Sequence, residues 1–378
     1  GITFVNSVQD NDSINILNYR NFYNGGGVAI GDLNNDGLPE VFFTANQGSN
    51  KLYLNKGNLQ FEDISEKAGF KNKLQYSTGV VFVDINHDNW LDIYVCNAGN
   101  MQDAGLRKNQ LFINDHNLHF TDSAAAYGLD DDGYSTQASF FDYDMDGDLD
   151  CFIINQSHHP HSNIVDTSNR RKYDALSGDR LYRNDLSITG KFTDVSAQAG
   201  IYQSSLGYGL GIATGDFNND GWDDIYVGND FHENDYYYLN NGNGTFTESG
   251  AAHFKHYSRF SMGNDAADYN NDGQLDIVTV DMLPQDEKVL KTYGSDENPD
   301  TYKYKLMGHG YQNQYSRNAL QRNNGNGSSF SETGLQSGIS ATDWSWAPLF
   351  ADFDNDGNKD LFISSGIVKR PVDLDYIR

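Results

Sequence analysis

Short apolar segments recur along the chain, and an acidic nonapeptide precedes each of them. The segments IYV, CFII and LFI are apolar on consecutive residues rather than on alternate ones. Such runs are typical of strands whose sheet is covered on both faces. Before the nonapeptides lie runs rich in small residues, such as GGGVAIG and GLGIATG. The pattern predicts a first strand, a tight acidic loop and a buried second strand in each repeat.

Two further short strands are predicted to complete each repeat. The third strand is a segment of the type KLYLN or QLFIN, which ends in Asn, and the fourth opens with Phe six to eight residues later. The closing Asn residues are Asn55, Asn114, Asn184, Asn240 and Asn323, and the opening Phe residues are Phe61, Phe120, Phe192, Phe246 and Phe330. Four-stranded units that stack radially cover both sheet faces, so the repeats favour an all-β fold, a β-propeller of four-stranded blades.

The nonapeptide has the pattern D-x-[DN]-x-D-[GN]-x-x-[DE] and occurs six times. Its copies lie at residues 32–40, 84–92, 142–150, 216–224, 268–276 and 352–360. A string of helix–loop–helix calcium hands would need a Glu at position 12 and flanking helices, whereas here the acid falls at position 9. We expect residues 1–378 to form a single β-propeller domain whose last unit is incomplete, with insertions at about 158–179 and 282–318.

The spacing of oxygen-bearing residues in the nonapeptide points to Ca²⁺. This ion takes six to eight oxygen ligands, and the side chains at positions 1, 3 and 5 of a tight loop converge on one point. Position 6 must turn sharply, which suits Gly or, in the second copy, Asn89. Position 7 offers its carbonyl, and the acid at position 9 closes the shell. The predicted ligands are Asp32, Asn34, Asp36, Leu38 and Glu40; Asp84, Asn86, Asp88, Trp90 and Asp92; Asp142, Asp144, Asp146, Asp148 and Asp150; Asp216, Asn218, Asp220, Trp222 and Asp224; Asp268, Asn270, Asp272, Gln274 and Asp276; and Asp352, Asp354, Asp356, Asn358 and Asp360.

A metal-free acidic turn is the alternative interpretation of these loops. Positions 1, 3, 5 and 9 carry 20 carboxylates over the six copies. Three or four carboxylates within a few ångströms repel one another strongly when no cation is present. Mg²⁺ is disfavoured because it rarely binds in cages made only of protein ligands. We therefore expect about six Ca²⁺ per chain, and the first site departs most from the pattern because Glu40 stands at position 9.

The composition narrows the class of protein. The chain has 53 acidic and 26 basic residues and a net charge of −27, which argues against a nucleic-acid partner because such proteins need a basic surface. Its 24 Tyr and 22 Phe exclude an acidic disordered chain. No apolar run approaches the roughly 20 residues of a membrane helix. No signal peptide begins at Gly1, so we expect either a cytosolic protein or a chain numbered after processing. Cys96 and Cys151 belong to different repeats, and we predict no disulfide between them.

The repeats resemble the FG-GAP repeat, also called the VCBS repeat, of integrin α-chain N-terminal propellers and many secreted bacterial proteins. In that family the acidic loop binds calcium. The stretches FYNGGGVAIGDLNNDGLPEVFFTANQGSNKLYLNKG, FEDISEKAGF and TDWSWAPLFADFDNDGNKDLF are most similar to large Bacteroidetes-type surface lipoproteins. This resemblance implies seven blades in the complete domain and export to the cell surface, outer membrane or periplasm of a Gram-negative bacterium. It also implies a lipid anchor on an upstream Cys, and it supplies no established activity.

The face opposite the calcium loops is the expected binding surface. In an up-and-down blade, the loops after the first and third strands share one face. The long insertions, residues 98–109, 158–179 and 282–318, are therefore expected on the other face. Loops that accept insertions often carry function. Arg170, Arg171 and Tyr173 would suit an acidic sugar or a carboxylate, and Tyr302 and Tyr304 could stack on sugars or dock a protein. A surface salt-bridge patch and a small core within the insertion are the alternatives.

The leading hypothesis is a calcium-stabilised cell-surface propeller without catalytic activity that binds a glycan or a protein. It would reach a membrane only through an upstream lipid anchor or a membrane-protein partner, for example as a lipoprotein subunit of an outer-membrane assembly. No H-E-x-x-H, G-x-S-x-G or P-loop motif occurs. The rival hypothesis is a polysaccharide lyase or hydrolase on a calcium-binding propeller, with Tyr or His as the base and Arg holding a uronate. A spacer within a larger chain is the third.

Overall fold

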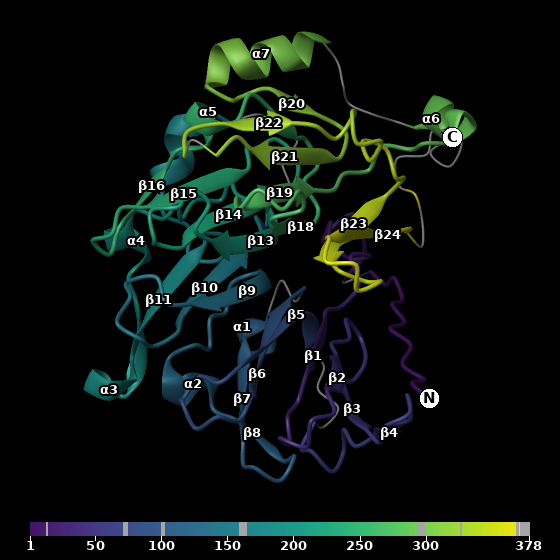
Figure 1. Cartoon of the computed structure of the whole chain (residues 1–378), viewed down its shortest axis with the longest axis vertical. Coiled ribbons are helices and arrows are strands. Elements are labelled where there is room, and N and C mark those ends of the chain that lie inside the picture. The colour runs from purple at the N-terminus through teal and green to yellow at the C-terminus, as the bar shows by residue number, and fades with distance from the viewer. Residues whose placement is uncertain are drawn as a thin grey trace. The chain divides into compact units, whose positions relative to one another are not determined.

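The structure of the chain, a computed structural model, describes residues 1–12, 14–70, 75–99, 103–158, 165–293, 299–325, 327–367 and 370. The chain divides into two compact units. The first comprises Gly1–Phe140, Asp148–His158 and Arg180–Val195, and the second comprises Phe141–Gly147, His159–Asp179 and Ser196–Arg378. Antiparallel sheets make up most of the regular structure in each unit (Figure 1).

Three four-stranded antiparallel sheets belong mainly to the first unit. The first sheet contains β1 (Val28–Gly31), β2 (Glu40–Phe43), β3 (Lys51–Asn55) and β4 (Phe61–Asp63). The second contains β5 (Tyr76–Val83), β6 (Asp92–Ala98), β7 (Gln110–Asn114) and β8 (Phe120–Asp122), and the third contains β9 (Ser135–Phe141), β10 (Asp150–Asn155), β11 (Arg180–Asp185) and β12 (Lys191–Asp194). The short helices of this unit are α1 (Ala104–Arg107), α2 (Ala124–Tyr127) and α3 (Leu186–Thr189).

The second unit contains two further four-stranded sheets and two strand pairs. The fourth sheet contains β13 (Gly209–Gly215), β14 (Asp224–Asn229), β15 (Tyr236–Asn240) and β16 (Phe246–Glu248), and the fifth contains β18 (Asn264–Ala267), β19 (Asp276–Thr279), β21 (Ala319–Asn323) and β22 (Phe330–Glu332). The pairs are the antiparallel β23 (Ser345–Ala351) and β24 (Asp360–Ser365), and the parallel β17 (Tyr257–Ser258) and β20 (Gln314–Tyr315). Its helices are η1 (Thr167–Arg171), α4 (Ser196–Ala199), α5 (Gly250–His253), α6 (Glu287–Thr292) and α7 (Pro299–His309). Over the described residues of both units, no helix combines the length and the apolar character that crossing a membrane requires.

The same strand register recurs in the five four-stranded sheets. The residue that follows the last acid of the loop always faces the residue two places before the third-strand Asn, as Val41 faces Tyr53 and Ile277 faces Gln321. The predicted repeat of four short antiparallel strands, and with it the all-β class, is therefore confirmed. The number of blades stays a prediction.

Burial on both faces explains why the second strands are apolar on consecutive residues. Every residue of β6 and of β14 is buried. In the first unit, Phe42 of the first sheet shares a core cluster with Phe112 of the second. In the second unit, Tyr226 of the fourth sheet shares one with Ile277 of the fifth. The second strand β6 thus contributes side chains to two cores, Ile93 and Val95 to one and Tyr94 and Cys96 to the other.

The two cysteines lie in one of these cores. Cys96 and Cys151 belong to the same buried cluster in the first unit, together with Tyr94 and Leu111, and both thiols are free. Burial raises the pKa of both thiols. Because the thiolate is the reactive form of cysteine, these side chains act as small apolar packing groups.

Candidate metal centre

Two residues of each nonapeptide adopt the left-handed backbone conformation, and together they close the loop. Position 6 was expected to do so, and its φ is 66° at Asn89 and 83–93° at the Gly of the other copies. Position 4 does the same with φ of 57–59°; its residues are Asn35, His87, Met145, Asn219, Asn271 and Asn355. The sequence signal for position 4 is its Asn in four of six copies, since Asn tolerates this conformation better than most residues.

The carboxylate at position 1 is fixed by the backbone of its own loop. In the fourth copy, Asp216 accepts hydrogen bonds from the N–H groups of Asp220 at 3.0 Å and Gly221 at 2.8 Å. The equivalent two bonds occur in all six copies with N···O distances of 2.7–3.1 Å. The position-1 residues are Asp32, Asp84, Asp142, Asp216, Asp268 and Asp352. The turn itself therefore orients this carboxylate.

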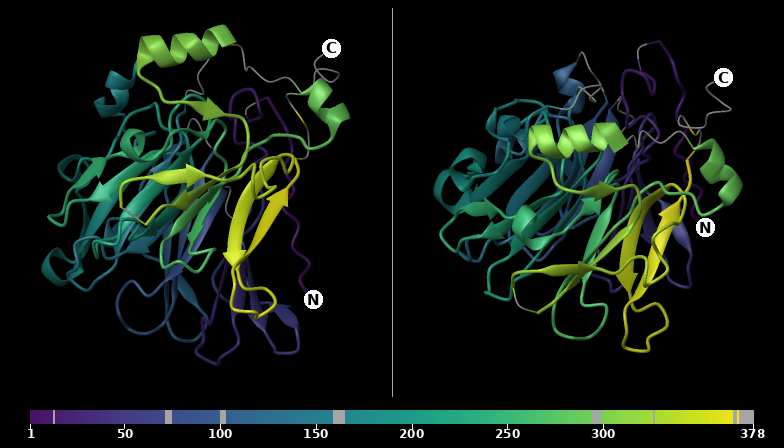
Figure 2. Two further views of the ribbon diagram at one scale, coloured as in Figure 1. Left: turned by 45° about the horizontal axis from the view of Figure 1, so that its top comes forward. Right: turned by 90° about the horizontal axis from the view of Figure 1, so that it is seen from above.

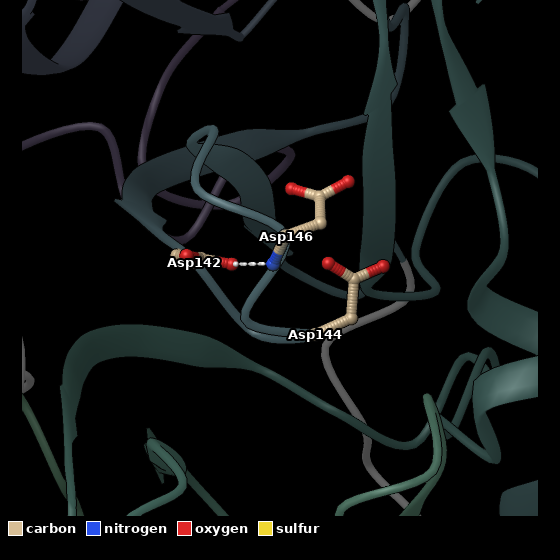
Figure 3. Close-up of side chains that lie close together, drawn as sticks. All are labelled: Asp142, Asp144 and Asp146. Atoms are coloured by element: carbon tan, nitrogen blue, oxygen red, sulfur yellow. Dashed lines mark hydrogen bonds between the residues drawn. The ribbon is translucent and has the colours of Figure 1, made fainter.

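Position 3 brings further oxygens to the same point. In the third copy, one carboxylate oxygen each of Asp142, Asp144 and Asp146 lies within 4.8 Å of the others, and the same holds for positions 1, 3 and 5 of the sixth copy. Figure 3 shows the three side chains of the third copy, in which a carboxylate oxygen of Asp142 accepts a hydrogen bond from the backbone N–H of Asp146 at 3.1 Å. In the other copies the side-chain oxygen of Asn at position 3 accepts the N–H of position 5 at 2.9–3.1 Å; these residues are Asn34, Asn86, Asn218 and Asn270.

Position 5 in turn orients the backbone of position 7. Its carboxylate accepts the N–H of position 7 at 2.8–3.0 Å in five copies. The bonded pairs are Asp36 with Leu38, Asp88 with Trp90, Asp220 with Trp222, Asp272 with Gln274, and Asp356 with Asn358. In the third copy position 7 is Asp148, which is half-buried. The bond keeps position 7, the predicted carbonyl ligand, next to the acidic side chains.

The acid at position 9 is buried and ties the loop to the third strand. In the fourth copy, Asp224 accepts the N–H of Asn240 at 2.8 Å and that of Phe217 at 3.2 Å. Five of these acids are 0% exposed, namely Glu40, Asp92, Asp150, Asp224 and Asp276. Asp360 of the sixth copy is exposed. Position 9 therefore has a structural role in addition to its predicted role as a ligand.

Burial perturbs the ionisation of position 9. It raises the pKa of Asp92 and of Asp224 to about 7, and that of Asp276 to about 6. The carboxylates at positions 1 and 5 of the same loops push in the same direction, because like charges disfavour ionisation. A cation in the loop would favour the ionised form of all these groups.

The Asn that ends the third strand links neighbouring repeats. The Asn240 side chain donates to the carbonyl of Asp223 in its own loop at 3.1 Å and to that of Tyr143 in the preceding loop at 2.8 Å. Asn114 and Asn323 make the equivalent pairs of bonds. The sequence identified this Asn as a mark of the repeat, but its contact with the preceding loop joins residues about 100 positions apart and has no local signal.

The donor set of the nonapeptide fits a hard cation. The predicted side-chain ligands are carboxylates and amide oxygens, with no thiol and no imidazole among them. Ca²⁺ selects oxygen ligands and tolerates irregular geometry, whereas a softer metal would call for Cys or His. The residues present therefore fit Ca²⁺.

The candidate ligand-binding residue Arg170 is engaged inside the second unit. Its guanidinium forms a two-oxygen ion pair with Glu233, with Nε at 3.1 Å from Oε1 and 3.2 Å from Oε2. The Arg170 side chain is 13% exposed and that of Glu233 is 1% exposed. The guanidinium also lies 6.0 Å from the ring centre of Tyr236 and 5.8 Å from that of Tyr311. Within this arrangement, its charge is already matched by a carboxylate.

Among the other candidates, Arg171 is linked to Arg170 through two packed rings, since Tyr202 lies 5.2 Å from Tyr236 between ring centres and Arg170 lies over Tyr236. Arg171 lies over the ring of Tyr202 at 5.3 Å. Tyr173 is 64% exposed, and Tyr304 on α7 is 59% exposed. Tyr302 also lies in α7, and its side chain is outside the part that the structure describes. The exposed tyrosines are the members of this set that offer open surface.

A buried acid in the second unit makes a pH-dependent contribution to stability. Asp235 is 0% exposed, and its carboxylate accepts bonds from the Tyr226 hydroxyl at 2.6 Å, the Ser261 hydroxyl at 3.0 Å and the Asn229 N–H at 2.8 Å. Burial raises its pKa from 3.8 to about 7, and the neighbouring acid Asp281 adds to the shift. Folding therefore takes up a proton between these two pH values.

We expect the free energy of unfolding to fall as pH rises from about 4 to 7, by about 1 kcal/mol per unit from this group. The variant Asp235→Asn cannot titrate and should lack this component. Denaturant unfolding of both proteins in saturating calcium, at several pH values between about 5 and 8, checks this. Between these pH values, the free energy of unfolding of the wild type should fall by about 2 kcal/mol relative to that of the variant. Parallel profiles would contradict the assignment.

Comparison with known proteins gives a family and several distant relatives. Residues 32–95, 216–279 and 306–363 match the family described as FG-GAP-like repeat. Cartilage acidic protein 1 of Xenopus tropicalis is 27% identical over 210 residues, which are 55% of this chain and 29% of the relative. The Mus musculus protein of the same name is 26% identical over 204 residues, covering 54% and 28%. The chain thus spans less than a third of the length of these relatives.

Solved structures show a broad likeness at low identity. Rhamnogalacturonan lyase YesW has a TM-score of 0.41 at 12% identity, covering 92% of this chain and 56% of that one. The V. cholerae biofilm matrix protein Bap1 has a TM-score of 0.39 at 12% identity, covering 82% and 39%. The β-fructofuranosidase BmSUC1 of Bombyx mori has a TM-score of 0.36 at 11% identity, covering 68% and 55%.

Proposed function

This chain belongs to the FG-GAP repeat family, and from that membership we propose that it is a calcium-stabilised extracellular repeat protein that binds a glycan or a protein. Each nonapeptide holds one Ca²⁺, so a loaded chain carries about six ions and its net charge falls from −27 to about −15. Each ion cross-links its loop and neutralises the carboxylates that would otherwise repel one another.

One observation carries the calcium proposal, namely the convergence of oxygens in the loops. Three carboxylates in the third copy and three in the sixth bring oxygens within 4.8 Å of one another. The loop backbone holds the position-1 carboxylate in all six copies and the position-5 carboxylate in five of them, so the loop conformation itself orients these side chains. A preformed cluster of anionic oxygens is the donor arrangement that Ca²⁺ requires.

Calcium content tests this proposal through two matched variants. After dialysis against calcium-containing buffer, elemental analysis is expected to find about six ions in the wild type and about five in Asp146→Ala, because Asp146 is a position-5 ligand of the third loop. Asn219→Ala is the control. Asn219 stands at position 4 of the fourth loop, is exposed, and donates to Gln274 Oε1 at 2.7 Å; its loss should leave about six ions. Zero or one ion in the wild type, or the same loss in both variants, would contradict the proposal.

The extended architecture and the location follow as part of the same proposal. Each four-stranded sheet is one blade of a single β-propeller domain over residues 1–378, and the complete domain has seven blades. The protein is exported and works at the cell surface, in the outer membrane or in the periplasm of a Gram-negative bacterium, held there by an upstream lipid anchor or a membrane-protein partner. Extracellular calcium modules bind at about 10⁻⁴–10⁻³ M, so such sites fill outside a cell.

The partner binds at the two insertions, residues 158–179 and 282–318. Support comes from their contact with each other, since the Tyr311 hydroxyl donates to the Val165 carbonyl at 2.6 Å. The exposed rings of Tyr173 and Tyr304 lie on these same segments. Aromatic side chains with one polar end are enriched at binding surfaces. A glycan or a protein is therefore the partner proposed, and the net charge of −27 argues against nucleic acid.

A polysaccharide lyase or hydrolase is the alternative function. It would need a cation to hold an acidic sugar, and Arg170, the candidate for that role, is already paired with Glu233. Binding without catalysis is therefore favoured. Incubation with acidic polysaccharides separates the two functions, because a lyase would release unsaturated ends and a binding protein would release none.

A further inference from the structure

Position 4 of the nonapeptide turns its own loop and also connects that loop to the next acidic loop along the chain. In three copies position 4 is an Asn whose side-chain amide donates a hydrogen bond to position 6 or 7 of the following copy. Each of these bonds lies within one of the two units. The bonded pairs are Asn35 Nδ2 with the Asn89 carbonyl at 3.1 Å, Asn219 Nδ2 with Gln274 Oε1 at 2.7 Å, and Asn271 Nδ2 with Asn358 Oδ1 at 2.9 Å.

In the second copy, the bond from the first loop fixes a peptide group that also contacts a predicted ligand. The Asn89 carbonyl and the Trp90 N–H belong to one peptide group. Its oxygen accepts the hydrogen bond from Asn35, and its N–H donates to the carboxylate of Asp88 at 2.9 Å. The next carbonyl, that of Trp90, is the one predicted to bind Ca²⁺. The first loop therefore helps to orient a carboxylate ligand and the carbonyl ligand of the second loop.

The sixth copy is connected to the fifth through a side chain. The amide oxygen of Asn358 accepts from Asn271, and its amide nitrogen donates to Asp356 Oδ1 at 3.0 Å. Asp356 is the predicted position-5 ligand of the sixth loop, so a single side chain lies between the fifth loop and that ligand. Figure 2 shows the sixth loop between the yellow strands β23 and β24, at the end of the second unit away from α7. The connection thus lies away from the insertion that carries α7.

A second kind of hydrogen bond joins two of these pairs of loops. The third-strand Asn donates to one carbonyl of its own repeat's loop and to one of the preceding loop, as described above. The first and second loops are joined in this way, and so are the fourth and fifth, so each of these pairs is held at two points. The bonds run from Asn114 to the Leu33 and Leu91 carbonyls at 2.8 and 3.1 Å, and from Asn323 to the Phe217 and Leu275 carbonyls at 2.8 and 3.2 Å.

The second and third copies carry no amide at position 4. Their residues there are His87 and Met145, and the third loop is joined to the fourth through Asn240 instead. The position-4 amides therefore divide the loops into a connected pair, the first and second, and a connected series, the fourth to the sixth.

We infer that the position-4 Asn side chains couple calcium binding between neighbouring loops, so that an ion in one loop raises the affinity of the connected loop for its own ion. This inference rests on the proposed calcium function. A bound ion fixes positions 3 and 5 of its loop, and position 4 lies between them. The Asn is then held where it orients ligands of the next loop, so less conformational entropy is lost when the second ion binds. The coupling is reciprocal between the two sites.

Two tryptophans allow the coupling to be measured in single loops of the whole chain. Trp90 and Trp222 stand at position 7 of the second and fourth loops. Tb³⁺ is a hard cation that takes the oxygen ligands of Ca²⁺ sites, and an indole beside it sensitises its luminescence. In a Trp222→Phe background, the titration with Tb³⁺ reports the second loop. In a Trp90→Phe background it reports the fourth.

Removing one position-4 amide should weaken the neighbouring site. Read from Trp90, Asn35→Ala should lower the Tb³⁺ affinity of the second loop about two- to fivefold, although the substitution lies in the first loop. Asn219→Ala is the matched control, because it removes the same amide from a loop of the other unit, and it should leave the Trp90 reading unchanged. Read from Trp222, the two variants should exchange roles. Both should still bind about six ions at saturation.

Emptying the neighbouring loop shows whether the effect depends on its ion. Asp36→Ala removes a predicted ligand of the first loop and should lower the affinity read from Trp90 by a similar factor. Asn35→Ala should then add little, because an empty first loop no longer holds its position-4 side chain.

The ion count separates a failure of coupling from a failure of the calcium function. If neither tryptophan reports Tb³⁺ and elemental analysis finds no calcium, both are overturned. If the chain binds about six ions but Asn35→Ala leaves the Trp90 titration unchanged, the loops fill independently and the coupling alone is overturned. It is also overturned if Asn35→Ala has the same effect with the first loop emptied by Asp36→Ala as with it filled, because the bond then shapes the second loop regardless of the neighbouring ion.

Discussion

Removing calcium with a chelator is expected to lower the melting temperature of this protein by about 10 °C. A ligand that binds only the folded state contributes about 1.4 kcal/mol per site at about ten times its dissociation constant, or about 8 kcal/mol over six sites. For a chain of this length, the entropy of unfolding converts that free energy into about 10 °C. The local cause is the repulsion within each loop, such as that among Asp352, Asp354 and Asp356, whose oxygens converge within 4.8 Å.

Calorimetry of the same sample in calcium and in chelator measures this effect. Mg²⁺ is the control ion, and it should restore little of the lost stability because it demands a smaller, near-octahedral shell and keeps its waters. High salt in chelator should restore part of it, because salt screens repulsion among exposed carboxylates. Coincident melting curves in calcium and in chelator would mean that backbone N–H groups suffice to hold the acidic side chains, and that the loops are turns without a metal.

The strands could be predicted because the same pattern of a small-residue strand, an acidic loop and an apolar strand occurs six times in the sequence. A buried second strand needs consecutive apolar residues, and a tight loop before it needs Asp and Gly at fixed spacing. Residues that recur at the same position in every copy mark the strand boundaries. The fourth strands accordingly begin at the predicted Phe or one residue before it, as β16 begins at Phe246 and β12 at Lys191. Repetition thus supplied, within one chain, part of what an alignment of relatives would supply.

The contacts between repeats could not be predicted in the same way. Asn240 and Tyr143 are 97 residues apart, and nothing near either residue specifies that they meet. The same is true of position 9, where spacing alone suggests a metal ligand. The structure adds that Asp224 anchors the third strand through the N–H of Asn240. A recurring acid at the start of a strand can bind a metal or anchor a neighbouring strand, and the sequence pattern is the same for both roles.

The proposed binding surface shows the limit of sequence reasoning most clearly. Arg170 and Arg171 are adjacent basic residues in an insertion, and from the sequence they form one patch. In the structure Arg170 pairs with Glu233, 63 residues further along, while Arg171 lies over the ring of Tyr202. The side chain that turns inward is selected by tertiary packing, because only the fold brings Glu233 within reach of η1.

Breaking the Arg170–Glu233 pair is the second large effect that we expect. Glu233→Gln keeps the shape of the side chain and its acceptor for the Asn234 N–H, but it leaves the buried Arg170 guanidinium without its hydrogen-bonded carboxylate partner. Removing one partner of a buried ion pair costs about 3–5 kcal/mol, which for a chain of this length is a fall in melting temperature of about 4–6 °C. Asp63→Asn is the control, because its partner Lys51 is 36% exposed and an exposed pair contributes at most about 1 kcal/mol.

The double variant Arg170→Met with Glu233→Gln decides what Arg170 does. If the arginine is a structural partner of Glu233, removing both charges should recover most of the stability that Glu233→Gln alone loses, because no unpaired charge remains in the interior. Calorimetry of the wild type, both single variants and the double variant gives this coupling directly. If Glu233→Gln instead has the melting temperature of the wild type, the Arg170 guanidinium must reach solvent when its ion pair with Glu233 is lost. Arg170 would then again be a candidate, like Tyr173, for binding an acidic sugar or a carboxylate.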